Sequence, residues 1–206
     1  MDIRDNTLTV LTSARLGIIG GLFTCIAYPL LLFAPLPKHA VFVLAALIGP
    51  ALGVASFGLQ QVLDLEGAHV WSRLGVGLNA LAGALLSAML LVQLAVGEYA
   101  AGAKPSREVV AVWLGLDVAW DAYIGLGTIC FSLAMLRHAR FGRAFAFSGL
   151  AIALVLLALN LYSFPTPPAS AGLVDVGPAV GLWYLAVTLQ MWRSLSWVQE
   201  RAISTP

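Results

Sequence analysis

Two acids inside an apolar run are the residues best suited to chemistry in this sequence. The stretch "WLGLDVAWDAYIGLG", residues 113–127, carries Asp117 and Asp121 four positions apart, with Trp120 directly before the second acid. Residues four apart in a helix lie on one face, one turn from each other. Two carboxyl groups at that spacing can hold a proton, transfer it, or bind a cation.

The composition indicates that these acids lie inside a membrane. The chain has 206 residues, of which 60% are hydrophobic and only 10% charged, and its mean hydropathy is +0.91. Soluble domains carry roughly a quarter charged residues, and about 20 apolar residues suffice to span a bilayer. We therefore predict an all-α polytopic membrane protein whose residues 1–206 form one bundle of six transmembrane helices, at about 16–36, 40–63, 74–97, 109–136, 144–164 and 173–192.

The basic residues predict the orientation of this bundle. With six crossings, both termini and the second and fourth connections lie on the same side. That side holds eight of the eleven basic residues, whereas the other side holds only Lys38, Lys104 and Arg107. Cationic connections stay in the cytoplasm, so we expect both termini to be cytoplasmic and the protein to lie in a bacterial inner (plasma) membrane.

At helical spacing, the two acids share one helix face with further polar and small residues, which form a polar stripe. Counting from the outer end of the fourth run, Asp117 lies roughly 12 Å and Asp121 about 18 Å into the membrane. Steps of three or four residues produce one line of polar and small side chains at Trp113, Asp117, Asp121, Gly125, Thr128 and Ser132. An ionised acid at mid-bilayer costs a few kcal/mol. Because no lysine or arginine lies inside any run, we expect the stripe to face the bundle and at least one acid to be protonated at rest.

Further polar and aromatic residues are expected near the outer ends of the last two runs. Asn160 ends the fifth run, and Asp175 opens the sixth, which continues to Trp183 and Tyr184. Together with the fourth run they predict an outer-leaflet pocket with a few convergent polar groups, lined by Trp113, Asp117, Trp120, Asp121, Tyr123, Asn160, Asp175, Trp183 and Tyr184. Tryptophan and tyrosine also collect in interfacial belts, which is the alternative for Trp113, Trp183 and Tyr184.

Other features predict packing. Gln60, Gln61 and Asn79 form a second polar group, which we interpret as interhelical hydrogen bonds. Small residues recur every four positions at Gly75, Asn79, Gly83 and Ser87, and Gly17 and Gly21 repeat the pattern. This spacing predicts a compact bundle, with a homo-oligomer contact as an alternative. Pro50 lies in the middle of the second run, where we expect the helix to bend.

Several chemistries are excluded or disfavoured. Both lysines and all three histidines lie in connections, and no paired-histidine motif occurs, which argues against retinal-type, zinc and bis-histidine haem sites. Cys25 and Cys130 stand alone on separate runs and read as packing residues. A net charge of +1 leaves the chain without the excess of positive charge that nucleic-acid binding needs. We assign no cofactor, no metal and no catalytic residue, and we expect membrane lipids as partners.

Three functions remain open. The first is binding or transport of a small cationic or neutral solute in the outer-leaflet pocket, coupled to protonation of Asp117 or Asp121. The second is a structural or accessory subunit whose acids only pack helices. The third is an intramembrane enzyme acting on a lipid-like substrate, with Asp121 as the acid and Asn160 or Tyr123 assisting; we favour a non-enzymatic function over this one.

Overall fold

The computed structural model describes residues 3–67, 69–99, 104–163 and 176–204, and this part of the chain is helical, with no strand. Five of its helices are long and apolar enough to cross a membrane. The described helices are α1 (Ile3–Phe33), α2 (Lys38–Asp64), α3 (His69–Tyr99), α4 (Arg107–Met135), α5 (Gly142–Ser163), α6 (Gly177–Arg193) and α7 (Leu195–Ser204).

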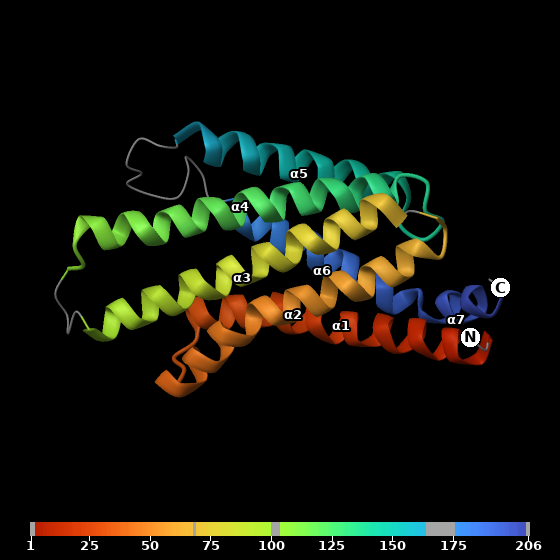
Figure 1. Ribbon diagram of the computed structural model, residues 1–206, viewed down its shortest axis with the longest axis horizontal. Coiled ribbons are helices and arrows are strands. Elements are labelled where there is room, and N and C mark those ends of the chain that lie inside the picture. Colours follow the sequence, from red (N-terminus) through yellow and green to blue (C-terminus); the bar gives the residue numbers. More distant parts are fainter. Residues whose placement is uncertain (1–2, 68, 100–103, 164–175, 205–206) are drawn as a thin grey trace.

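The first five helices run up and down beside one another (Figure 1). In chain order each packs against the next, and α6 packs against both α1 and α5 and thereby closes the bundle. We call the end where α1 begins the N-terminal end; there α2 turns into α3 and α4 turns into α5. The opposite end, where α1 connects to α2, is called the distal end.

Each of the runs expected second to fifth corresponds to one helix of the structure, although α3 begins at His69 rather than at the expected 74. The run at 40–63, for example, corresponds to α2 (Lys38–Asp64), and the run at 109–136 to α4 (Arg107–Met135). The helical nature of these four runs is therefore confirmed. The sixth run, expected at 173–192, corresponds to α6, which is 17 residues long. Its Pro178 lies in the first turn, where the missing amide donor costs little.

The first helix differs from expectation because it begins at Ile3 rather than at 16. Its early turns are polar, yet they are covered by α7, which the apolar pattern did not predict. Thr7 Oγ1 donates to the carbonyl oxygen of Ala202 at 3.3 Å, and Val10 is buried in the same cluster as Val198 of α7. Packing against α7 thus supports a helix that extends beyond the apolar run.

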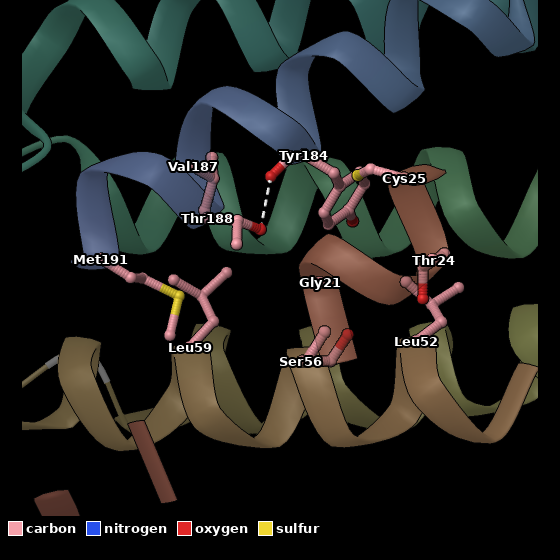
Figure 2. A pocket seen from close by; sticks show the side chains of 11 residues that line it. Gly21, Thr24, Cys25, Leu52, Ser56, Leu59, Tyr184, Val187, Thr188 and Met191 are labelled. Atoms are coloured by element: carbon pink, nitrogen blue, oxygen red, sulfur yellow. Dashed lines mark hydrogen bonds between the residues drawn. The ribbon is translucent and has the colours of Figure 1, made fainter. Parts of the chain in front are cut away.

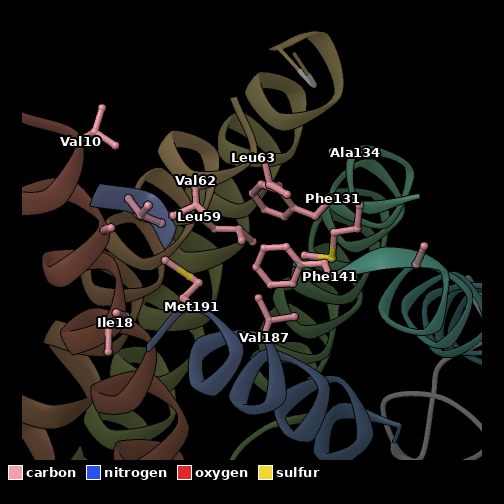
Figure 3. Packing of buried hydrophobic residues seen from close by; sticks show 14 of the residues in the cluster. Val10, Ile18, Leu59, Val62, Leu63, Phe131, Ala134, Phe141, Val187 and Met191 are labelled. Carbon is pink, nitrogen blue, oxygen red and sulfur yellow. The ribbon is translucent and has the colours of Figure 1, made fainter. Parts of the chain in front are cut away.

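The largest apolar core lies in the N-terminal half of the bundle (Figure 3). Phe131 of α4 is fully buried there together with Leu63 of α2, and Met191 and Val187 approach from α6. In a bilayer the alternative to burial is contact with lipid, so these side chains stabilise the bundle through close van der Waals packing. This core holds α2, α4 and α6 together in the N-terminal half of the bundle.

Glycines allow the helix backbones to approach closely in two places. A Cβ atom added at Gly17 of α1 would lie 2.6 Å from Cα of Gly58 in α2, and one added at Gly83 of α3 would lie 2.5 Å from the carbonyl oxygen of Gly49. Gly21 and Gly75 likewise face side chains of other helices, Thr188 and Phe131. The compact packing is as expected, and these glycines face helices of the same chain.

Pro50 lies inside α2, which continues through it as one helix. Its ring is exposed on the outer side of the bundle, and it removes the amide donor that Ala46 O would otherwise receive. Ser87 of α3 compensates, because its hydroxyl lies 3.4 Å from Ala46 O and accepts from Gly49 N at 3.0 Å. A polar side chain from the neighbouring helix therefore satisfies the backbone at the proline.

Candidate functional site

The polar stripe of α4 faces the interior of the bundle. Four of its members are buried, namely Asp121, Gly125, Thr128 and Ser132. Trp113 and Asp117, nearer the distal end, are half-buried. The helix starts at a defined place because Ser106 Oγ accepts from Val109 N at 3.4 Å and caps its first turn.

Asp121 and Asn160 form a buried pair between α4 and α5. Asn160 Nδ2 donates to Asp121 Oδ2, and the two residues are 6% and 3% exposed. One turn along each helix, Ile124 and Leu156 belong to a fully apolar cluster. The carboxyl group thus lies in a low-dielectric part of the bundle with an amide as its partner. Both residues were predicted to line the same pocket, and the structure brings them together.

The distal neighbours of Asp121 are less tightly packed. Trp113 and Trp120 are partly buried against a small cluster formed by Ala27, Ile48, Leu86 and Met89. That cluster draws its side chains from α1 to α4, and in the described part of the chain α5 and α6 contribute none to it. Half-buried aromatic rings and the half-buried Asp117 therefore lie in the distal half of the bundle, between the Asp121–Asn160 pair and the distal end.

Three of the expected pocket residues do not join this group. Trp183 is buried and its Nε1 donates to Phe145 O at 3.1 Å, which places it beside the first turn of α5 at the N-terminal end. Tyr184 turns toward α3 and α4. Tyr123 is 37% exposed on the outer face of α4, and Asp175 lies outside the described residues.

The expected outer-leaflet position of Trp183 and Tyr184 is therefore wrong. It rested on counting depth from an apolar run that begins at 173. The helix begins at Gly177, and Val180 in its first turn already packs against Leu156 and Ile124 at the middle of α5 and α4. The depth of a side chain is set by where its helix enters the bundle, which hydropathy does not report.

Tyr184 is instead the centre of a polar network that joins four helices. Asn79 Nδ2 donates to Tyr184 Oη at 2.8 Å and to Ser56 Oγ at 2.9 Å, and the Thr128 hydroxyl lies 3.1 Å from Tyr184 Oη. The interhelical role expected of Asn79 is confirmed. Gln60 differs, because its amide donates to Asp64 one turn along the same helix.

A small cavity adjoins this network between α1, α2 and α6 (Figure 2). It measures about 20 Å³, which is room for a water molecule and not for a metabolite. Ser56, Tyr184 and Thr188 contribute polar groups to its wall, and Cys25 of α1 lies beside Tyr184. The cavity is thus suited to one water that bridges polar groups of α2 and α6.

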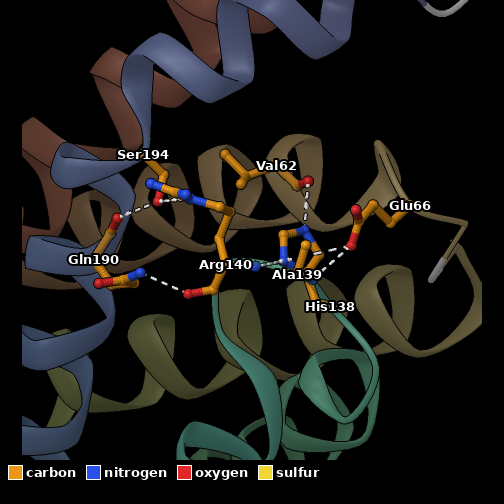
Figure 4. A network of polar contacts seen from close by, with 7 residues as sticks. All are labelled: Val62, Glu66, His138, Ala139, Arg140, Gln190 and Ser194. Carbon is orange, nitrogen blue, oxygen red and sulfur yellow. Dashed lines mark hydrogen bonds and ion pairs between the residues drawn. The ribbon is translucent and has the colours of Figure 1, made fainter.

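His138 organises a second polar network at the N-terminal end, in the connection between α4 and α5 (Figure 4). Its Nε2 lies 3.2 Å from Val62 O of α2, and its Nδ1 accepts from Arg140 N at 3.2 Å. Burial lowers the pKa of His138 and outweighs the opposing effects of the hydrogen bond to Val62 O and of the Glu66 charge; the charge of Arg140 adds a smaller lowering. The ring is therefore neutral at pH 7, with its proton on Nε2. The basic residues of this connection predicted only the orientation of the bundle, and the sequence pattern gave no indication of the structural role of His138.

No group of three histidine, cysteine, aspartate or glutamate side chains in the described ranges could hold a metal ion. The fold and the buried polar groups define an all-helical protein of the membrane-embedded type. No family model matches the chain, and no curated protein or solved structure matches it significantly.

Proposed function

We propose that this protein binds a small cationic or neutral solute in the distal half of its bundle, and that binding is coupled to the proton on Asp121. The observation that carries the proposal is the buried Asp121–Asn160 pair in an apolar cluster. No lysine or arginine occurs on α4 between Arg107 and the helix end. Intramembrane acids of this kind are functional by default.

The position of Asp117 supports the same proposal. It lies one turn distal to Asp121 and is only half-buried, beside Trp113 and Trp120. Aromatic faces attract organic cations, and a carboxylate near them supplies the counter-charge. A solute entering from the distal end would therefore meet Asp117 and the two tryptophans first, and the Asp121–Asn160 pair below them.

A structural or accessory subunit is the second candidate. The favouring observation is that the Asn160 amide already contacts the Asp121 carboxyl, which ties α4 to α5. The intramembrane-enzyme hypothesis has less support, because Tyr123 is exposed on the outer face of α4, away from the buried acid. The solute-binding protein and the structural subunit differ in one respect: only solute binding requires that Asp121 can gain and lose a proton.

Replacing Asp121 with asparagine separates them. The amide keeps the shape of the side chain and an acceptor for Asn160 but cannot ionise. Binding of tetraphenylphosphonium to the protein in nanodiscs is expected to strengthen as pH rises in the wild type, because loss of the Asp121 proton leaves an attracting anion. In Asp121→Asn the pH dependence should become markedly weaker, leaving only the part that Asp117 contributes, and affinity at high pH should fall about tenfold.

Glu98→Gln is the matched control, since it also converts an acid to an amide. Glu98 is exposed at the distal end and pairs with Lys38 at 2.7 Å, so its loss should leave the probe's pH dependence intact. A probe affinity that varies with pH equally in Asp121→Asn and the wild type would contradict the proposal. A wild type that binds neither this cation nor smaller amines would favour the structural subunit.

We further propose six crossings with both termini in the cytoplasm, with α6 as the sixth. The Thr7–Ala202 hydrogen bond supports an even number, because it holds α7 beside the first turns of α1 (Figure 1). In a cysteine-free background, His39→Cys at the distal end should react with a membrane-impermeant thiol reagent added to intact cells. Ser204→Cys should not react, and its labelling from outside would reverse the orientation.

A further inference from the structure

A groove of about 370 Å³ opens at the N-terminal end of the bundle. It lies between the turn that joins α2 to α3 and the connection that joins α4 to α5. Its volume is that of a small-ligand site. It is lined by Glu66, Trp71, Leu133, Leu136, Arg137 and His138 among others, none of which belongs to the proposed solute site.

The groove lies where three helices leave the apolar part of the bundle. The candidate membrane span that contains α2 ends at Glu66, the span of α3 begins at Val70, and the span of α4 ends at Met135. Trp71 beside them is 46% exposed, and exposed tryptophans prefer the level of lipid headgroups. The charged rim of the groove is thus placed at headgroup level, and Leu133 and Leu136 line it beside the end of α4.

The groove presents one negative and one positive side chain. The Glu66 carboxylate is held in position because its Oε2 accepts from Ala139 N at 2.7 Å (Figure 4). Arg137 is exposed, and among the described residues its guanidinium has no hydrogen bond or ion pair. His138, at the base, is neutral for the reasons given above. A ligand with both an anionic and a cationic group complements this pair of charges.

We propose that the groove binds a phospholipid whose headgroup carries a phosphate and a primary ammonium group, as phosphatidylethanolamine does. Arg137 binds the phosphate, since a guanidinium matches two phosphate oxygens. Glu66 accepts a hydrogen bond from the ammonium group, and Leu133 and Leu136 contact the first methylenes of the acyl chains. A purely anionic headgroup would meet repulsion from Glu66, and a choline headgroup has no N–H to donate.

The test uses the full-length protein in detergent with lipids of identical acyl chains. Native mass spectrometry measures binding of dioleoyl phosphatidylethanolamine, phosphatidylcholine and phosphatidylglycerol, and free phosphoethanolamine is a fourth arm. We expect the ethanolamine lipid to bind about tenfold more tightly than either other lipid. The free headgroup should not compete at comparable concentration, since it lacks the acyl chains; equal binding of it would assign the groove to a soluble ligand and overturn the proposal.

Two variants assign the roles of the charges. Arg137→Gln should lower the affinity for the ethanolamine lipid about tenfold. Glu66→Gln keeps an acceptor for Ala139 N, and it should lose the preference over phosphatidylglycerol. The control is Arg143→Gln, an exposed arginine at the same end that does not line the groove. If Arg137→Gln and Arg143→Gln weaken lipid binding equally, the arginines attract headgroups only in a general way, and the proposal is overturned. Equal binding of all three lipids would overturn it for the same reason.

Discussion

Replacing Gly83 with alanine is expected to lower the free energy of unfolding by about 1–3 kcal/mol, which is the usual cost of forcing an extra group into a packed core. The new Cβ would lie 2.5 Å from the carbonyl oxygen of Gly49 and 3.1 Å from its Cα. Both atoms belong to backbone, so no side-chain rotation relieves the overlap. The helices must separate, and the Ser87–Gly49 hydrogen bond at 3.0 Å that supports α2 beside Pro50 would lengthen with them.

The measurement is reversible unfolding in mixed micelles, followed by circular dichroism as the denaturing detergent fraction rises. Gly77→Ala is the matched control, because Gly77 lies on the same helix and a Cβ there meets no atom within 4 Å. Alanine is favoured over glycine in helices by about 1 kcal/mol, so this control should be neutral or stabilising. If Gly83→Ala and Gly77→Ala shift stability equally, the close contact of α2 and α3 does not exist as described.

Replacing Asn79 with alanine is expected to lower the free energy of unfolding by about 2–3 kcal/mol, an effect as large as that of Gly83→Ala. The change removes donors to both Ser56 and Tyr184 and leaves a void at a fully buried position. Three helices lose their shared polar contact. The same unfolding assay reports the loss.

Tyr184→Phe separates the hydrogen bond from the void. It removes one hydroxyl and should cost about 0.5–1.5 kcal/mol. Because Asn79 and Tyr184 are in contact, the double variant should be less destabilised than the sum of the single variants, by about 0.5–1.5 kcal/mol. Gln61→Ala is the control for removal of an amide, since no described interaction involves Gln61, and it should stay within about 0.5 kcal/mol of the wild type. Strict additivity at Asn79 and Tyr184 would contradict the network.

The pairing of Asp121 with Asn160 shows how much of the candidate site could be predicted from the sequence. Both were identifiable because polar groups within apolar runs are rare and must turn inward. That they touch depends on the register between α4 and α5, which the short connection around His138 fixes by bonding to Val62 and Arg140. The pattern of one helix contains no information on that register.

Hydropathy and helical spacing by themselves determined that this protein is a helical, membrane-type bundle, which stretches of the chain form its second to fifth helices, and which face of α4 turns inward. These properties follow from short-range rules, since an apolar run of sufficient length needs no partner to be recognised. Tertiary structure alone decided the depth of Trp183 and Tyr184, the extension of α1 along α7, and the joining of Asn79 to Tyr184. Each of these depends on contacts between residues that are remote in the chain, and such contacts are selected by packing rather than by the local sequence.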